Sequence, residues 1–381
     1  MTVPAVDSPE AGTTELLIDT DVHEMLSSKR DLAPYLAGHW RNVIETYFYD
    51  ASPLAPNSGW MVTAPSTGAR TEWLPPRAAA GEGSAAATAA GTRLDLLQEH
   101  LFEQEGVTAA ILNGFFYPSC FPAHFEFATA LATAYNDWQI DNWIERDPRL
   151  YGSVHVVTAD PQQAAREIDR VAQHPRIVQV LIPTTLNRQY GDPIYRPIFE
   201  AAARNDLVVA MHQSPATETA LGIPRTVFEW HTLAAPQAAM SHLTSILAGG
   251  IFDLFPTLKL AILEASFAWL PWYLWRADEN YREYRWDIPW VKRLPSEHVR
   301  SNVRFATQPL GEVQPHDLLK LVELVESDEL FMFSTDYPHY DADSADAVLP
   351  RTLPETLRRK IRFENALATY PRLAHLRSEA A

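Results

Sequence analysis

The sequence is poor in cysteine, in long apolar runs and in basic residues. Its single cysteine, Cys120, excludes an intramolecular disulfide and is typical of a reducing compartment, so we expect a cytoplasmic protein. No uncharged apolar run reaches the roughly 18 residues of a membrane span, and residues 1–14 lack the apolar segment of a secretory signal. Lys and Arg number 31 against 48 Asp and Glu, which gives a formal net charge of −17. Nucleic acids and anionic membranes are therefore not expected partners.

Short apolar runs alternate with stretches of helical period along the 381 residues. The predicted strands are 16–20, 107–112, 151–157, 177–182, 207–211, 259–263, 302–306 and 330–335. The clearest predicted helices are 125–145, 161–173 and 197–204. This alternation predicts an α/β fold of the (β/α)₈ TIM-barrel type. The competing doubly wound sheet is less favoured, because no G-x-G-x-x-G motif follows any of the strands.

Two segments depart from this pattern. Residues 1–14 are rich in Pro, Ala, Glu and Gly, and we expect them to be a disordered N-terminal tail. Residues 51–92, after the first strand, contain a long Ala/Gly/Ser tract without periodicity and predict a flexible insertion. In a barrel this insertion emerges over the mouth, where it is either a lid or a surface loop. Residues 15–375 are expected to form a single domain.

Side chains able to bind a metal ion follow several predicted strands. Asp21 and His23 lie two residues apart, so an extended backbone directs both to the same side. His212 ends the fifth strand, Glu264 follows the sixth, and Asp336 follows the eighth. Because the carboxyl ends of barrel strands meet at one face, these residues are expected to lie together there. Each alone also has a structural explanation, such as a core histidine or a helix cap.

Longer motifs around these residues resemble a known family. They are Gly249-Gly250-Ile251-Phe252-Asp253-Leu254-Phe255-Pro256, Glu264-Ala265-Ser266-Phe267-Ala268-Trp269-Leu270-Pro271 and Phe333-Ser334-Thr335-Asp336-Tyr337-Pro338-His339. Together with the D-x-H at Asp21, they resemble the amidohydrolase superfamily. The resemblance is to its amidohydrolase-related branch, which includes aminocarboxymuconate-semialdehyde decarboxylase and the resorcylate and hydroxybenzoate decarboxylases. It covers roughly residues 16–372.

The resemblance implies a single divalent metal ion bound by four residues. They are Asp21, His23, His212 and Asp336. The familiar first motif is H-x-H, and Asp21 here replaces its first histidine. A set of two oxygens and two nitrogens suits Zn²⁺ or Mn²⁺. Members with two metal ions carry a lysine at the end of strand four, which is absent from residues 181–184.

The resemblance also suggests which residues carry protons. Asp336, Glu264, His339 and His231 are the expected catalytic residues, with His242 as a further alternative. Decarboxylases of the branch often have a histidine where this chain has Glu264. Glu264 is expected to be buried with a raised pKa and to transfer protons, and a salt bridge to Arg276 is its alternative role. His339 is expected to orient Asp336.

Three functions remain open from the sequence. The first is hydrolysis by metal-activated water of a small substrate that is aromatic or bears a carboxylate. The second is non-oxidative decarboxylation of an aromatic or enol acid, and the third is a metal-free barrel that binds a ligand. Aromatic residues near the expected mouth, at 115–117, Trp269 and Tyr337, favour a flat ligand. The aromatic segment from Trp272 to Trp290 is expected to form a homodimer contact.

Overall fold

The computed structural model describes most of the chain. The described residues are 16–47, 90–114, 125–184, 188–213, 226–310, 313–339 and 341–378. The predicted tail at 1–14 and the predicted insertion, except for its last residues 90–92, lie outside them. The aromatic residues at 115–117 also lie outside. The prediction that 15–375 form a single domain stays a prediction.

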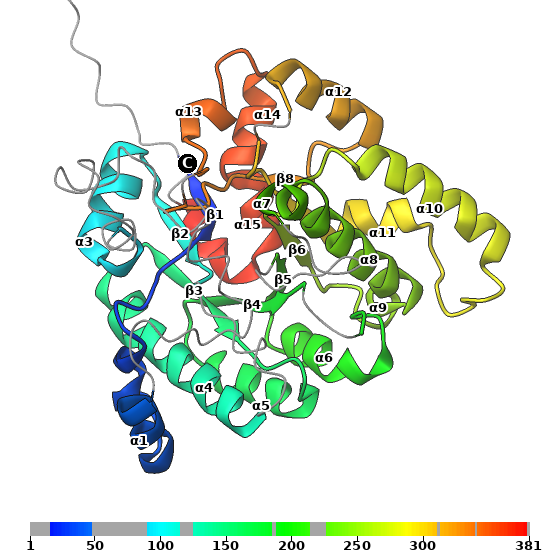
Figure 1. Cartoon of the computed structure of the whole chain (residues 1–381). Helices are drawn as coiled ribbons and strands as arrows, with labels where there is room; N and C mark the ends of the chain where they lie inside the picture. Colours follow the sequence, from blue (N-terminus) through cyan, green and yellow to red (C-terminus); the bar gives the residue numbers. More distant parts are fainter. Residues whose placement is uncertain are drawn as a thin grey trace, which may run out of the picture.

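Eight parallel strands form one sheet in the order in which they occur in the sequence (Figure 1). They are β1 (Ile18–Val22), β2 (Ala109–Leu112), β3 (Leu150–His155), β4 (Ile177–Pro183), β5 (Val208–His212), β6 (Leu260–Leu263), β7 (Val303–Ala306) and β8 (Phe331–Met332). The segment after β8 returns to β1: Thr20 N–H donates to the Phe333 carbonyl, and Asp336 N–H donates to the Asp21 carbonyl. The predicted (β/α)₈ barrel is therefore confirmed, and each predicted strand overlaps an observed one.

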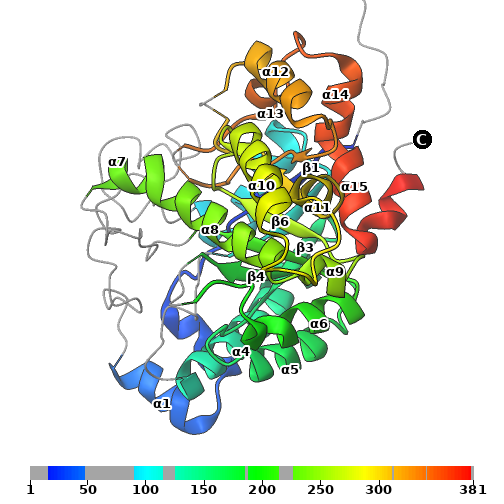
Figure 2. The same ribbon diagram turned by 90° about the vertical axis from the view of Figure 1, so that its right-hand side faces the viewer.

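Helices surround the barrel (Figures 1 and 2). They include α1 (Gly38–Tyr47), α3 (Leu94–Leu97), α4 (Phe125–Asn142), α5 (Pro161–Val171), α6 (Arg196–Arg204), α7 (Val227–Glu229), α8 (Ala235–Ala248), α9 (Ile251–Leu254), α10 (Leu270–Tyr284), α11 (Pro295–Asn302), α12 (Pro315–Val325), α13 (Ala345–Val348), α14 (Glu355–Arg359) and α15 (Asn365–Thr369). The three helices predicted most clearly are α4, α5 and α6. Helix α5 shows why: Asp160 accepts the N–H of Gln163 as an N-cap, and Pro161 occupies the first turn.

Two apolar layers pack on the two sides of the sheet. Alternate strand residues, such as Leu17 and Val22, belong to the large layer between the strands and the helices. Others, such as Ile18, fill the barrel interior, where residues of α15 and the following turn, among them Tyr370, complete the layer. Figure 2 shows α15 and α7 on opposite sides of the barrel. One end of the barrel is thus closed by apolar packing, and polar chemistry is confined to the other end.

A bulge in β1 directs the D-x-H motif inward. The register of β1 against β2 shifts between Asp19 and Val22. Ile18 faces the interior and Val22 the outer layer, so strict alternation is broken between them. Asp21 and His23 consequently lie on the inner side. Bulges commonly redirect side chains next to functional sites.

The aromatic segment predicted to form a dimer contact is exposed. Trp272, Trp275 and Trp286 are 60%, 57% and 73% exposed. The homodimer itself stays a prediction. Among the described helices, none is long and apolar enough to cross a membrane.

The buried carboxylate of Asp19 holds the seam between β1 and the end of β8. Its Oδ1 accepts the N–H groups of Asp21 and Thr335, each at 3.1 Å, and its Oδ2 accepts the Thr335 hydroxyl at 2.6 Å. Burial, partly offset by the hydrogen bonds from Thr335 and Asp21, raises the pKa of Asp19 to about 7. One side chain therefore fixes two segments that lie more than 300 residues apart in the sequence.

Asp19→Ala is expected to destabilise the fold. It leaves two buried N–H groups without an acceptor, which should lower the free energy of unfolding by about 2–4 kcal/mol. Urea denaturation followed by circular dichroism measures this change. Asp160→Ala is the matched control, because it removes only a helix cap and should cost about 1 kcal/mol. Equal losses in the two variants would show that Asp19 does not hold the seam.

Candidate metal centre

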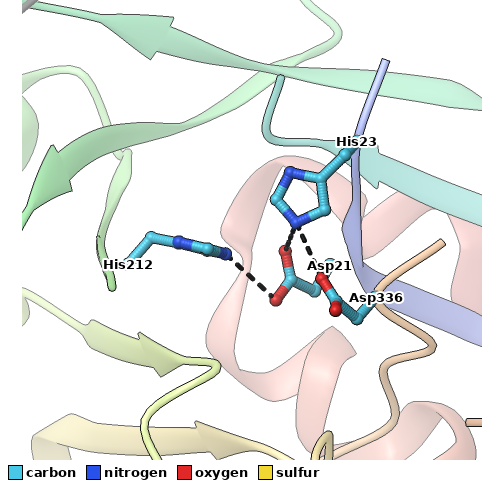
Figure 3. A group of neighbouring side chains, drawn as sticks. All are labelled: Asp21, His23, His212 and Asp336. Atoms are coloured by element: carbon cyan, nitrogen blue, oxygen red, sulfur yellow. Dashed lines mark ion pairs between the residues drawn. The ribbon is translucent and has the colours of Figure 1, made fainter. Parts of the chain in front are cut away.

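Four buried side chains converge at the carboxyl end of the barrel (Figure 3). They are the residues that the sequence predicted as metal ligands: Asp21 in β1, His23 directly after β1, His212 at the end of β5, and Asp336 after β8. His23 Nε2 lies 3.3 Å from Asp21 Oδ1 and 2.9 Å from Asp336 Oδ1. His212 Nε2 lies 3.6 Å from Asp21 Oδ2. The donor atoms of all four lie within 4.8 Å of one another.

Backbone carbonyls orient both imidazole rings of this cluster. His23 Nδ1 donates to the Gly114 carbonyl, and His212 Nδ1 donates to the Gln213 carbonyl at 2.6 Å. In the neutral ring this leaves the lone pair of Nε2 directed at the carboxylates. A metal ion can lie between acceptors that face each other in a buried site, in place of a proton on the ring. The tautomers that the backbone selects are therefore those of metal-binding histidines.

The charges of the four side chains also suit a bound divalent cation. Burial alone lowers the pKa of His23, but Asp21 and Asp336 outweigh burial and raise this pKa well above its usual range. Burial likewise raises the pKa of Asp21, but His212 and His23 outweigh it, and the net shift is downward. Two carboxylates and two neutral imidazoles balance one divalent cation, and their oxygen and nitrogen donors suit Mn²⁺ or Zn²⁺. The residues present thus fit a bound metal ion.

Asn113, which follows β2, binds one of the two carboxylate oxygens of Asp21. Its side-chain amide donates to Asp21 Oδ1 at 2.7 Å, and its own oxygen accepts from Ser153 at 2.9 Å. Within the described part of the chain, Asp21 Oδ2 accepts no hydrogen bond. The sequence analysis missed Asn113. The same signal, a polar residue directly after an apolar strand, would have found it.

His339 lies where the sequence predicted it. Its Nδ1 is 2.9 Å from both carboxylate oxygens of Asp336, and its ring stacks on that of His23 with 4.6 Å between centroids. Asp336 has a left-handed backbone, with φ of +63°. Such conformations cost energy and concentrate at functional sites. The geometry agrees with an orienting role for His339, which stays a prediction.

Glu264 lies beside the cluster. It is buried, its Oε2 is 3.5 Å from His212 Nε2, and its φ of +44° is also left-handed. Burial, with Asp336 and Asp341, raises the pKa of Glu264 well above its usual range. The alternative salt bridge is wrong: Arg276 is exposed, and no ion pair joins it to Glu264 among the described residues.

Of the two remaining predicted proton carriers, His231 lies beside Glu264, and His242 has a structural role. His231, in the π-helical turn Trp230–Ala234, has a donor atom within 4.8 Å of those of Glu264 and Asp341. Asp341 was missed, although it lies only two residues beyond His339. His242 is structural, because its Nε2 lies 3.0 Å from the Thr184 carbonyl and its Nδ1 accepts from Tyr190 N–H.

The aromatic residues expected at the mouth do not form a ligand wall where they are described. Trp269 packs edge-on against Tyr273 and Phe305 in the outer apolar layer. Tyr337 is fully buried, and its hydroxyl group contacts His100 at 3.0 Å. Both rings serve packing, so they give no information about the shape of a ligand.

Comparisons with known proteins identify similar chains. Residues 115–372, more than half of the chain, match the family described as Amidohydrolase. Gamma-resorcylate decarboxylase from Polaromonas sp. JS666 is 24% identical over 260 residues, which cover 63% of this chain and 76% of that protein. The amidohydrolase resemblance proposed from the sequence is thereby confirmed.

Solved structures show the same fold. Dihydroxybenzoic acid decarboxylase from Polaromonas sp. JS666, with bound manganese and 2-nitroresorcinol, has a TM-score of 0.65 and 18% identity, covering 94% of this chain and 98% of that one. The 5-carboxyvanillate decarboxylase from Novosphingobium aromaticivorans, with manganese and 4-hydroxy-3-methoxy-5-nitrobenzoic acid, has a TM-score of 0.68 and 21% identity, covering 94% and 96%.

His212→Ala is expected to lower the metal content of the purified protein. It removes one nitrogen donor from the cluster. Loss of a residue that only contacts a metal ligand typically weakens metal binding by 10–100-fold, and loss of a ligand itself should weaken it at least as much. Elemental analysis after reconstitution with Mn²⁺ measures the change. His242→Ala, which removes a buried histidine outside the cluster, is the control. Equal metal content in both variants would place the metal elsewhere.

Proposed function

The chain belongs to the amidohydrolase family, and on this basis we propose that it is a manganese-dependent enzyme that decarboxylates an aromatic acid. The observation that carries the proposal is the buried cluster of two carboxylates and two imidazoles, whose Nε2 atoms face the carboxylates. This arrangement suits a divalent cation, and manganese occupies two solved relatives of the same fold. Asp21, His23, His212 and Asp336 would hold the ion.

Decarboxylation replaces hydrolysis as the preferred reaction. The sequence placed hydrolysis first because Glu264 stands where decarboxylases often have a histidine. The relatives reverse this order, since the similar proteins described above are named as decarboxylases of resorcylate, dihydroxybenzoate and carboxyvanillate. A buried carboxylic acid supplies a proton as well as an imidazolium does, so Glu264 is compatible with either reaction.

The reaction requires one proton and releases carbon dioxide. A proton adds to the ring carbon that bears the carboxylate, the carbon–carbon bond then breaks, and its electron pair restores the aromatic ring. A ring hydroxyl group beside the carboxylate donates electron density and eases this protonation. When bound, the metal ion supplies positive charge that holds the carboxylate and the neighbouring oxygen. The proton itself must come from a side chain of the protein.

Glu264 is the proposed proton donor. Burial, with Asp336 and Asp341, raises the pKa of its carboxyl group, which favours the protonated form, and it lies beside the cluster but outside the proposed set of four ligands. His231 and Asp341 lie next to it, toward the half-buried rim of the site. We propose that His231 returns a proton to Glu264 after turnover. His339 holds Asp336 in its ligating orientation.

The reaction is tested by supplying the manganese-loaded protein with hydroxybenzoates that carry a hydroxyl group next to the carboxylate. We expect release of carbon dioxide and appearance of the corresponding phenol, both abolished when a chelator removes the metal. Carbon dioxide is measured by a coupled assay, and the phenol by chromatography. Acid release from esters or amides without carbon dioxide would restore hydrolysis. Ligand binding without metal or turnover would favour the metal-free barrel.

Glu264→Gln is expected to lower turnover by roughly 10²–10⁴ without changing metal content, since glutamine keeps the shape but cannot supply the proton. Steady-state kinetics and elemental analysis give the two readouts. Glu167→Gln, which changes a buried carboxyl group bonded to Asn136 and Arg170, is the matched control and should leave turnover unchanged. Turnover near that of the wild type in Glu264→Gln would move proton transfer to His231 or His339.

A further inference from the structure

The last residue of the opening motif, Glu24, has no part in the mechanism above. It is nevertheless fully buried, directly after His23. We propose that Glu24 is a positioning residue: its carboxylate anchors the turn at Gly114, and the carbonyl group of this glycine orients His23 for metal binding. The inference rests on the proposed metal site but not on the reaction performed there.

Glu24 accepts hydrogen bonds from two separate parts of the fold. Its Oε2 accepts the N–H of Gly114 at 2.8 Å, in the turn that follows β2. Its Oε1 accepts the Tyr135 hydroxyl at 3.0 Å and the Gln139 side-chain amide, both from α4. The contacts with α4 therefore fix the rotamer of Glu24 through Oε1, and Oε2 holds the turn at Gly114. Burial disfavours the charged form of Glu24, and these hydrogen bonds offset that cost in part.

Gly114 is held at both of its backbone polar groups. Its N–H donates to Glu24, and its carbonyl accepts from His23 Nδ1. Its φ of +64° lies in the left-handed region, and an added Cβ would collide with the Tyr135 hydroxyl. Only glycine fits at this position. Because glycine is also the residue with the widest backbone freedom, the direction of its carbonyl depends on an external anchor, and Glu24 is that anchor.

This path from Glu24 to His23 has a consequence for metal binding. The Gly114 carbonyl selects the tautomer of His23 and sets the angle of its ring, and thus the direction of Nε2. Partners of this kind, one step removed from the metal, typically change metal affinity by 10–100-fold when they are removed. A purely structural role, in which Glu24 only ties β1 to α4, predicts a loss of stability with unchanged metal affinity.

The experiment compares Glu24→Ala with Glu24→Gln in the full-length protein. Affinity for Mn²⁺ is measured by titration with electron paramagnetic resonance of the free ion, and stability by thermal unfolding of the metal-free chain. Alanine removes the anchor, so we expect affinity to fall by 10–100-fold. Glutamine keeps an acceptor for Gly114, although its N–H₂ group then faces the Gln139 amide, so we expect a clearly smaller loss of affinity than in Glu24→Ala. Unchanged affinity in Glu24→Ala, or equal losses in both variants, would overturn the proposal.

Two glycines provide a second test if Glu24→Ala fails to fold. Gly114→Ala should weaken Mn²⁺ binding, because the Cβ displaces the turn and its carbonyl. Gly106→Ala is the matched control: Gly106 has a similar φ of +73° but nothing within 4 Å of an added Cβ. Equal metal affinities in these two variants would contradict the proposal.

The readouts separate this inference from the proposed function. Metal affinity is measured without turnover, so a protein that binds Mn²⁺ but decarboxylates nothing would refute only the reaction. A protein in which Glu24→Ala binds Mn²⁺ as the wild type does, while decarboxylation proceeds, would refute only the role of Glu24. A wild-type chain without affinity for Mn²⁺ would refute both.

Discussion

Closure of the barrel between β1 and the end of β8 is the constraint on which the site depends. Asp21 and Asp336 are separated by most of the chain, and they meet because the Asp336 N–H donates to the Asp21 carbonyl across this seam. The Asp19 carboxylate reinforces the seam by accepting N–H groups from both sides. Its burial costs energy that only these hydrogen bonds offset. The first strand therefore supplies two proposed ligands, the bulge that aims them, and the clamp that fixes the last one.

The polar groups around the four converging residues mainly set the direction in which the donor atoms of these residues point. Backbone carbonyls set the tautomers of His23 and His212, and Asn113 occupies one oxygen of Asp21. Each contact removes a way for the cluster to neutralise itself internally. What remains is a set of buried oxygen and nitrogen donors whose negative charge favours a cation among them. Stability of the fold and affinity for a metal ion are thus linked in this protein, because the same buried charges serve both.

Glu264 illustrates how environment decides the role of a residue. In the sequence it could pair with Arg276 of α10, and that pairing would have made it structural. The fold instead places Arg276 in solvent and Glu264 in a site already crowded with carboxylates, which raises its pKa. A carboxyl group kept protonated by burial and neighbouring charge is suited to give a proton to carbon. The glutamate at this position, where the resemblance led us to expect a histidine, therefore argues less strongly against decarboxylation than it did in the sequence.

The amino-acid sequence alone determined the order of strands and helices and the four residues that converge, because apolar periodicity and position at strand ends are local properties. The resemblance to the family came from its longer motifs. Only the tertiary structure decided which of several histidines lie beside the cluster: His231 and His339 do, whereas His242 bonds to Thr184 and Tyr190. It likewise revealed Asn113, Asp341 and the path from Glu24 through Gly114 to His23. Most of these roles depend on contacts between residues far apart in the sequence, on backbone carbonyl directions and on burial, and a one-dimensional pattern carries none of these.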